Sequence, residues 1–154
     1  MNLLQITSAV VWVDFFTIAL HKAVNLGNSL DAWYTTFGMV GVLSDCLVIV
    51  LGILLAQLLF APTSVLGLML TSVGIQMVHD VLFYLFVILP IPAGHNAMID
   101  LFKRYASENS WKILPYDGFM IASTALLASY LKGPWVPFIG LLGLYALTYI
   151  IYTR

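Results

Sequence analysis

Five runs of apolar residues dominate the 154-residue sequence and constrain its fold more than any other feature. They cover about residues 6–24, 34–60, 64–89, 116–131 and 135–152. An α-helix needs about 20 mostly apolar residues to cross the hydrocarbon core of a bilayer, and Pro62, Pro90 and Pro134 mark places where helices end between the runs. We therefore predict a single all-α domain over residues 1–154, an integral membrane helical bundle with about five transmembrane helices.

The composition supports this fold class and excludes others. Hydrophobic residues make up 62% of the chain and charged residues only 8%, whereas a soluble domain has about 25% charged residues. The formal net charge of −1 provides no basic surface for phosphates, so we expect no nucleic acid partner. The single cysteine, Cys46, can form neither an internal disulfide nor a thiolate zinc site by itself.

The longest polar stretch lies between the third and fourth runs and predicts one further helix over about residues 96–110. Asn96 is a suitable N-cap, and the residues after it place apolar side chains on one face and charged side chains, including Lys103 and Arg104, on the other. We expect this amphipathic helix to lie along the membrane surface. An ordinary connecting helix is the alternative.

The basic residues predict the orientation, because lysine and arginine are retained on the cytoplasmic side. With five spans, one side holds Lys132 alone, and the other side holds Lys22, Lys103, Arg104, Lys112 and Arg154. We expect an N-terminus outside and a cytoplasmic C-terminus. No basic segment precedes the first run and Asp14 interrupts it, which favours a retained anchor over a cleaved signal peptide. If this run lies flat, four spans place both termini on the same side.

Acidic residues inside the apolar runs are the main functional signal. Four of the seven carboxylates, those of Asp14, Asp45, Asp80 and Asp117, fall within or at the edge of a predicted span. Each costs about 2.5 kcal/mol or more at the bilayer centre, so such residues normally face the protein interior and have a partner. His79 directly precedes Asp80 in the third run, and Gln76 precedes Asp80 by one helical turn. We predict an ion or proton path formed by Asp14, Asp45, Gln76, His79, Asp80 and Asp117.

Two other interpretations of these acids remain open. In a structural or scaffold protein, the acids would pair with Lys103, Arg104, Lys112 or Lys22 at the inner interface, or form hydrogen bonds between neighbouring helices. In a metal-dependent enzyme acting on lipid, His79 and the acids would bind a divalent cation. No glycine-rich phosphate loop, His-x-x-x-His pair or Glu-x-x-His pair occurs in the sequence, so we assign no catalytic residue and expect no cofactor. An ion or proton channel or transporter is the favoured prediction.

Small residues within the runs predict close contacts between helices. Gly38 and Gly41, and likewise Gly140 and Gly143, are three residues apart and fall on one helix face. Such faces serve contacts within one chain or between copies, and we expect a homo-oligomer in the lipid bilayer.

Three segments resemble uncharacterised small membrane proteins of large double-stranded DNA viruses of algae and protists. They are residues 33–37 leading to Asp45, residues 76–84, and residues 96–117, which together with their surroundings cover about two thirds of the chain. The resemblance implies a viral membrane protein, in the inner membrane of the virion or in host membranes. It implies no particular activity and no catalytic residue.

Overall fold

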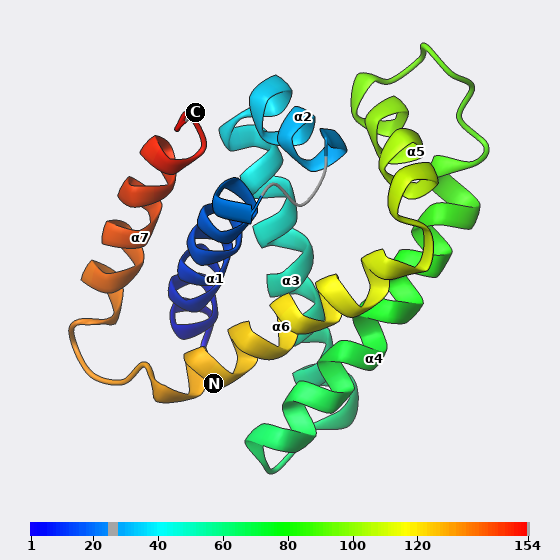
Figure 1. Ribbon diagram of the computed structural model, residues 1–154. Coiled ribbons are helices and arrows are strands. Elements are labelled where there is room, and N and C mark those ends of the chain that lie inside the picture. The colour runs from blue at the N-terminus through cyan, green and yellow to red at the C-terminus, as the bar shows by residue number, and fades with distance from the viewer. Residues whose placement is uncertain (25–27, 154) are drawn as a thin grey trace.

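The computed structural model describes residues 1–24 and 28–153, and within these ranges every regular element is a helix. Arg154, which contributes to the predicted orientation, lies outside the described residues. In chain order the elements are α1 (Leu3–Val24), α2 (Asn28–Phe37), α3 (Met39–Phe60), α4 (Val65–Phe83), the π-helix η1 (Tyr84–Ile88), α5 (Ala97–Asn109), the 3₁₀-helix η2 (Ser110–Lys112), α6 (Ile113–Tyr130) and α7 (Val136–Ile150), as Figure 1 shows. The chain is a helical bundle.

Three helical segments are long and apolar enough to cross a membrane: Leu3–Val24, Met39–Phe60 and Val65–Ile88. The outer faces of the helices expose large apolar side chains such as Phe16, Leu58 and Phe86, which suits contact with lipid tails. The helix α7, with 15 residues, is apolar but shorter. The structure is therefore compatible with a membrane protein, while the number of five crossings stays a prediction.

The second apolar run is divided in the structure, which corrects the predicted span of residues 34–60. Gly38 has a φ of 52°, in the left-handed region that glycine adopts without steric cost. This residue separates α2 from α3, so the apolar helix begins at Met39 and the residues from Tyr34 to Phe37 belong to a short helix across the end of the bundle (Figure 1).

Four helices surround the core, and α7 is added at one side. The helix α1 packs against α3, α6 and α7, and α4 packs against α3 and α6. At the α1–α7 contact, the Ser8 hydroxyl donates a hydrogen bond to the carbonyl of Val136 at 3.1 Å. A Cβ atom at Gly140 would lie 3.3 Å from Cα of Ser8, so this glycine permits the close approach. Gly140 thus serves packing within the chain, and homo-oligomerisation stays a prediction.

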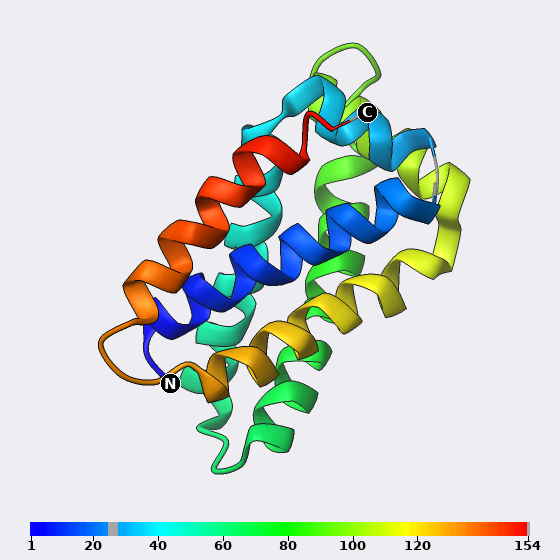
Figure 2. The same cartoon turned by 60° about the vertical axis from the view of Figure 1, so that its left-hand side comes forward.

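The two chain ends lie toward opposite ends of the bundle, as the views in Figures 1 and 2 agree. The end that holds the C-terminus also carries α2 and α5. Lys22, near the end of α1, donates a hydrogen bond to the carbonyl of Thr153 at 2.5 Å. The Asn96 side chain caps α5 as predicted, accepting hydrogen bonds from the amides of Met98 and Ile99 at 2.9 and 3.2 Å. The helix α5 packs against α2 and η1 and so covers this end of the bundle.

Candidate functional site

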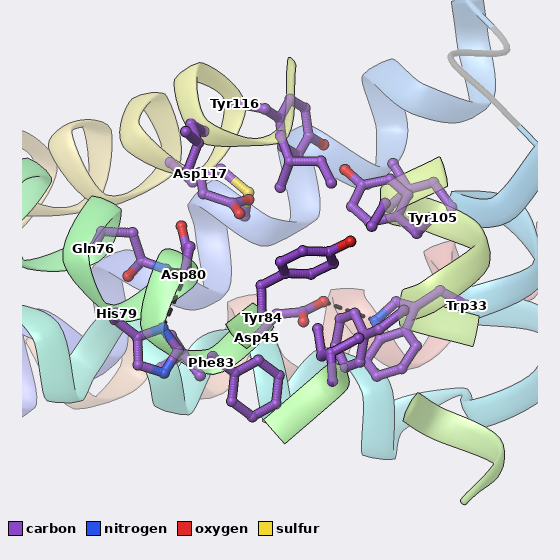
Figure 3. A pocket seen from close by; sticks show the side chains of 18 of the residues that line it. Trp33, Asp45, Gln76, His79, Asp80, Phe83, Tyr84, Tyr105, Tyr116 and Asp117 are labelled. Atoms are coloured by element: carbon purple, nitrogen blue, oxygen red, sulfur yellow. Dashed lines mark hydrogen bonds and ion pairs between the residues drawn. The ribbon is translucent and has the colours of Figure 1, made fainter. Parts of the chain in front are cut away.

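A cavity of about 510 Å³ lies at the end of the bundle that α2 and α5 cover (Figure 3). Its lining comes from α2, α3, α4, η1, α5, η2 and α6. Exposed lining residues, among them Tyr84 and Trp111, show that the cavity reaches the protein surface. Its volume falls in the range of about 300–1,000 Å³ that is typical of sites for small molecules.

Most of the residues predicted for an ion path line this cavity. Asp45 comes from α3 and Asp117 from the first turns of α6, while α4 contributes the lining residues Gln76, His79 and Asp80. Figure 3 shows Asp80 and Asp117 directed into the same part of the cavity, with Tyr84 between them and Trp33. Within the described residues, no hydrogen bond reaches the carboxylate of Asp117.

Asp45 is held in place by the indole of Trp33. The ring nitrogen Nε1 of Trp33 donates a hydrogen bond to Oδ2 of Asp45 at 2.9 Å. This contact depends on Gly41, one turn before Asp45, because a Cβ atom at position 41 would lie 2.9 Å from the same ring nitrogen. The break at Gly38 turns α2 back over α3 and brings the indole to this face.

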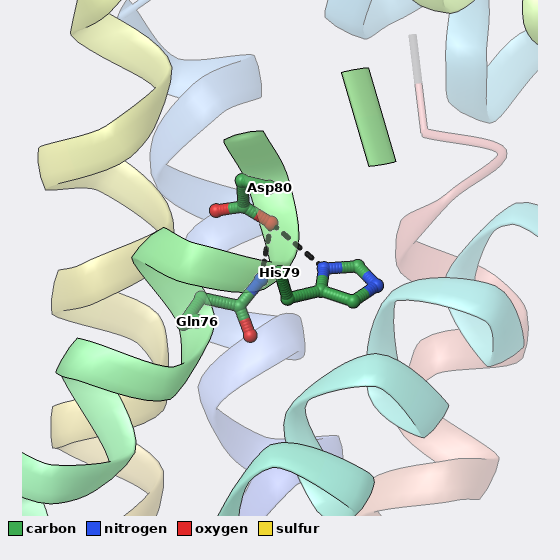
Figure 4. Close-up of polar contacts among 3 residues, drawn as sticks. All are labelled: Gln76, His79 and Asp80. Atoms are coloured by element: carbon green, nitrogen blue, oxygen red, sulfur yellow. Dashed lines mark hydrogen bonds and ion pairs between the residues drawn. The ribbon is translucent and has the colours of Figure 1, made fainter. Parts of the chain in front are cut away.

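Asp80 has one bonded oxygen and one free oxygen (Figure 4). Its Oδ1 accepts a hydrogen bond from Nε2 of Gln76 at 2.7 Å and lies 3.1 Å from Nδ1 of His79. Its Oδ2 is buried and has no partner within the described part of the chain. The His79 side chain is 42% exposed and its ring stacks on Phe83, so this histidine lies at the edge of the cavity and not in its centre.

Two residues of the cavity lining have further buried oxygens without a partner among the described residues: Oε1 of Gln76, which lies toward Gly52, and the hydroxyl of Tyr116. Gln76 is only 4% exposed. A buried polar group without a hydrogen bond costs about 1–3 kcal/mol, so water or a bound molecule is expected to satisfy these groups.

Asp14 is the one predicted path residue that does not line the cavity. It is completely buried in α1, and its Oδ2 accepts a hydrogen bond from Sγ of Cys46 at 3.0 Å. Cys46 follows Asp45 in α3 and therefore faces α1, on a different side of that helix from the cavity. Asp14 thus lies between α1 and α3.

The structure does not bring Lys103 or Arg104 to the acids, which is one of the two arrangements that the scaffold interpretation predicts. The other arrangement, hydrogen bonds between helices, is present from Trp33 to Asp45 and from Cys46 to Asp14. The ammonium group of Lys103 donates a hydrogen bond to the carbonyl of Ile91, in the segment that leads into α5, and Arg104 is exposed. In residues 1–24 and 28–153, the basic side chain in contact with a cavity acid is His79, whose Nδ1 lies 3.1 Å from Oδ1 of Asp80. The amphipathic pattern of α5 keeps its charged face away from the cavity.

Sequence reasoning missed the aromatic part of the lining. Trp33, Phe83, Tyr84, Phe102 and Tyr105 come from α2, α4, η1 and α5. The rings of Trp33 and Phe102 have centroids 4.8 Å apart, and those of Phe83 and Phe102 are 6.0 Å apart. The apolar face of α5 was visible in its periodicity, but nothing local indicated that it faces α2.

The tyrosines outside the apolar spans stay protonated. Burial raises the pKa of the Tyr34 hydroxyl well above its ordinary value, and the carboxylate of Asp45 raises it further. Burial also raises the pKa of Tyr105, with a contribution from Asp117. These phenols therefore add hydroxyl groups to this region but no charge.

Neither a metal centre nor a known relative identifies the site. Within the part of the chain that the structure describes, no three His, Cys, Asp or Glu side chains are close enough to hold one metal ion. Comparison with family models, with curated proteins and with solved structures returned no match. The chemistry of the cavity must therefore be argued from its own residues.

Proposed function

We propose that the chain is a polytopic membrane protein that transports a cation or a proton by means of the cavity carboxylates. One observation carries the proposal: Asp45, Asp80 and Asp117, from three different helices, line one cavity, and no lysine or arginine of the described residues pairs with them. Carboxylates without basic partners in a site of low dielectric attract a cation or take up a proton.

The shape of the cavity favours a transporter over a continuously open channel. Along α3, α4 and α6 the lining extends no further into the bundle than Ile49, Gln76 and Met120. Beyond this level Ile53 and Ile121 are completely buried and fill the space between the helices. A site open at one end and closed at the other is expected of a transporter in one of its states.

Polar side chains continue beyond the closed level. Ser72, one turn from Gln76 on α4, is completely buried, and its hydroxyl has no partner in the described residues. Thr124, one turn from Met120 on α6, is also buried. These two hydroxyls are the groups that a moving cation or proton would meet next.

The proposed orientation places the cavity at the cytoplasmic end. Lys22 and Thr153, near the C-terminus, are in contact there, and α5 with Lys103 and Arg104 covers the same end. The positive-inside rule assigns such an end to the cytoplasm. The membrane is then that of a virion or its host if the resemblance to viral proteins holds.

Flux into liposomes tests the proposal. The purified protein is reconstituted, and proton and monovalent cation fluxes are measured under an imposed gradient for the wild type, Asp80→Asn and Asp117→Asn. The matched control is Asp31→Asn, which removes the same charge at an exposed position outside the cavity lining. We expect flux for the wild type and Asp31→Asn and a strong loss for the cavity variants, with the helical content unchanged.

A scaffold protein gives a different result. It would show no flux above protein-free liposomes, and the substitutions at Asp80 and Asp117 would change only yield and thermal stability. That outcome would reject transport and leave a membrane-embedded structural bundle.

A further inference from the structure

The dimensions of the cavity are the first indication of its ligand. A cavity of about 510 Å³ has room for many atoms, whereas a single water molecule occupies about 30 Å³ in the liquid. A calcium ion requires six to eight oxygen ligands that converge on one point. The acids of the cavity do not converge in this way, since no three His, Cys, Asp or Glu side chains of the described residues could hold one ion.

The aromatic lining is the second indication. Trp33 and Tyr84 lie across the cavity from the paired side chains of Gln76 and Asp80 (Figure 3), and Phe83 and Phe102 also line the cavity. Aromatic faces attract organic cations and at the same time provide apolar contact area. An inorganic cation can use the charge attraction of such a wall but not its apolar contact area.

The third indication is a buried acceptor that lacks a donor. Oδ2 of Asp80 is buried beside the cavity, and no group in the described residues donates a hydrogen bond to it. When Asp80 is ionised, this oxygen only accepts hydrogen bonds, so a ligand with N–H groups complements it. The cavity thus combines the carboxyl groups of Asp80 and Asp117 with a lining of aromatic rings.

We infer that the cavity binds an organic ammonium ion with an apolar or aromatic body, its nitrogen bonded to Asp80 near Gln76 and Asp117 and its body packed against Trp33, Tyr84 and Phe102. This inference rests on the proposed function, because the ammonium ion would be the transported cation. The π-helix η1 supports the geometry, since it places Tyr84 and Ile88 in the lining at the end of α4. Such departures from the α-helix occur frequently at functional sites.

Direct binding to the intact protein tests the inference. The protein is placed in lipid nanodiscs and titrated calorimetrically with phenylbutylammonium, with its uncharged analogue phenylbutanol, and with potassium and calcium chloride. Empty nanodiscs provide the correction for partition into lipid. We expect saturable binding of the ammonium ion and none of the alcohol or the inorganic ions.

Substitutions assign the two parts of the site. Asp80→Asn should weaken binding of phenylbutylammonium by about tenfold to a hundredfold, because a charge-assisted hydrogen bond is lost while the shape is kept. Tyr84→Leu should weaken it by a smaller factor, because an aromatic face is removed while the carboxylates remain. The control Asp31→Asn should bind as the wild type does, and circular dichroism confirms the helical content of each variant.

The outcomes separate this inference from the proposed function. Equal binding of the alcohol and the ammonium ion, with no effect of Asp80→Asn, would overturn it in favour of an apolar pocket. Binding of an inorganic ion alone, or cation flux without any binding of the ammonium ion, would also overturn it and leave the proposed transport intact. If the well-folded wild type shows neither cation flux nor binding of the ammonium ion, both proposals are rejected.

Discussion

The substitution Gly41→Ala tests how the cavity is built, because it forces a methyl group against the indole that holds Asp45. The added Cβ atom would lie 2.9 Å from Nε1 and 3.0 Å from Cε2 of Trp33, closer than van der Waals contact allows. Both atoms belong to a buried ring that also packs on Phe37 and Phe102, so the methyl group would force the indole out of its present position. The hydrogen bond from Trp33 to Asp45 would be lost.

The expected change in stability follows from three contributions. Overpacking a well-filled site costs about 1–3 kcal/mol. A lost hydrogen bond that leaves a buried polar group without a partner costs about 1–3 kcal/mol, and alanine in place of glycine within a helix restores about 1 kcal/mol. Gly41→Ala should therefore lower the free energy of unfolding by about 1–5 kcal/mol.

Unfolding in mixed detergent micelles, followed by circular dichroism, measures the effect. The matched control is Gly74→Ala in α4, where an added Cβ atom has nothing within 4 Å. This control should be stabilised by about 0.5–1 kcal/mol, because only the helix preference of alanine acts. In the background Trp33→Leu, most of the cost of Gly41→Ala should disappear, because the two residues are in contact.

Two results would refute the reasoning. One is a Gly41→Ala protein that is as stable as the wild type. The other is a destabilisation by Gly41→Ala that is just as large in the Trp33→Leu background. This would show that the added methyl group does not contact the indole.

Two further predictions concern stability away from the cavity lining. Asn96→Ala removes the side chain that caps α5 and should destabilise this helix by about 0.5–2 kcal/mol. Hydrogen exchange should then be faster in α5 but not in α1. Unchanged protection of α5 would contradict the role of the cap. Cys46→Ala removes the hydrogen-bond donor to the fully buried Asp14 and should lower the free energy of unfolding by about 1–3 kcal/mol. Cys46→Ser retains a donor and should lower it by less. A serine variant that is less stable than the alanine variant would contradict this hydrogen bond.

Local properties of the sequence were sufficient to predict the helical class and most helix positions. In a bilayer the backbone of an apolar run must form its hydrogen bonds within the run, and a helix achieves this. The side chain of Asn96 caps amides that are only two and three residues away. The same applies to Gln76 and Asp80, which are one turn apart and so meet on one helix face. These contacts depend on sequence spacing alone.

The break at Gly38 shows where local information ends. A glycine inside an apolar run fits both a continuous helix and a sharp turn, because both conformations are open to it. The packing of α2 against α3 and α5 accompanies the positive φ. The predicted span from residue 34 was wrong at its start for this reason.

Only the tertiary structure decided which residues line the cavity. Asp14 and Asp45 have similar apolar neighbours in the sequence, yet the packing of α1 against α3 encloses Asp14 beside Cys46 and leaves Asp45 at the cavity. The contact of Trp33 with Phe102 likewise joins segments that are far apart in the chain. Hydrophobic burial acts on whole helix faces without direction, so the sequence determines that these helices pack together, while the fit of their side chains determines which carboxylates share one space.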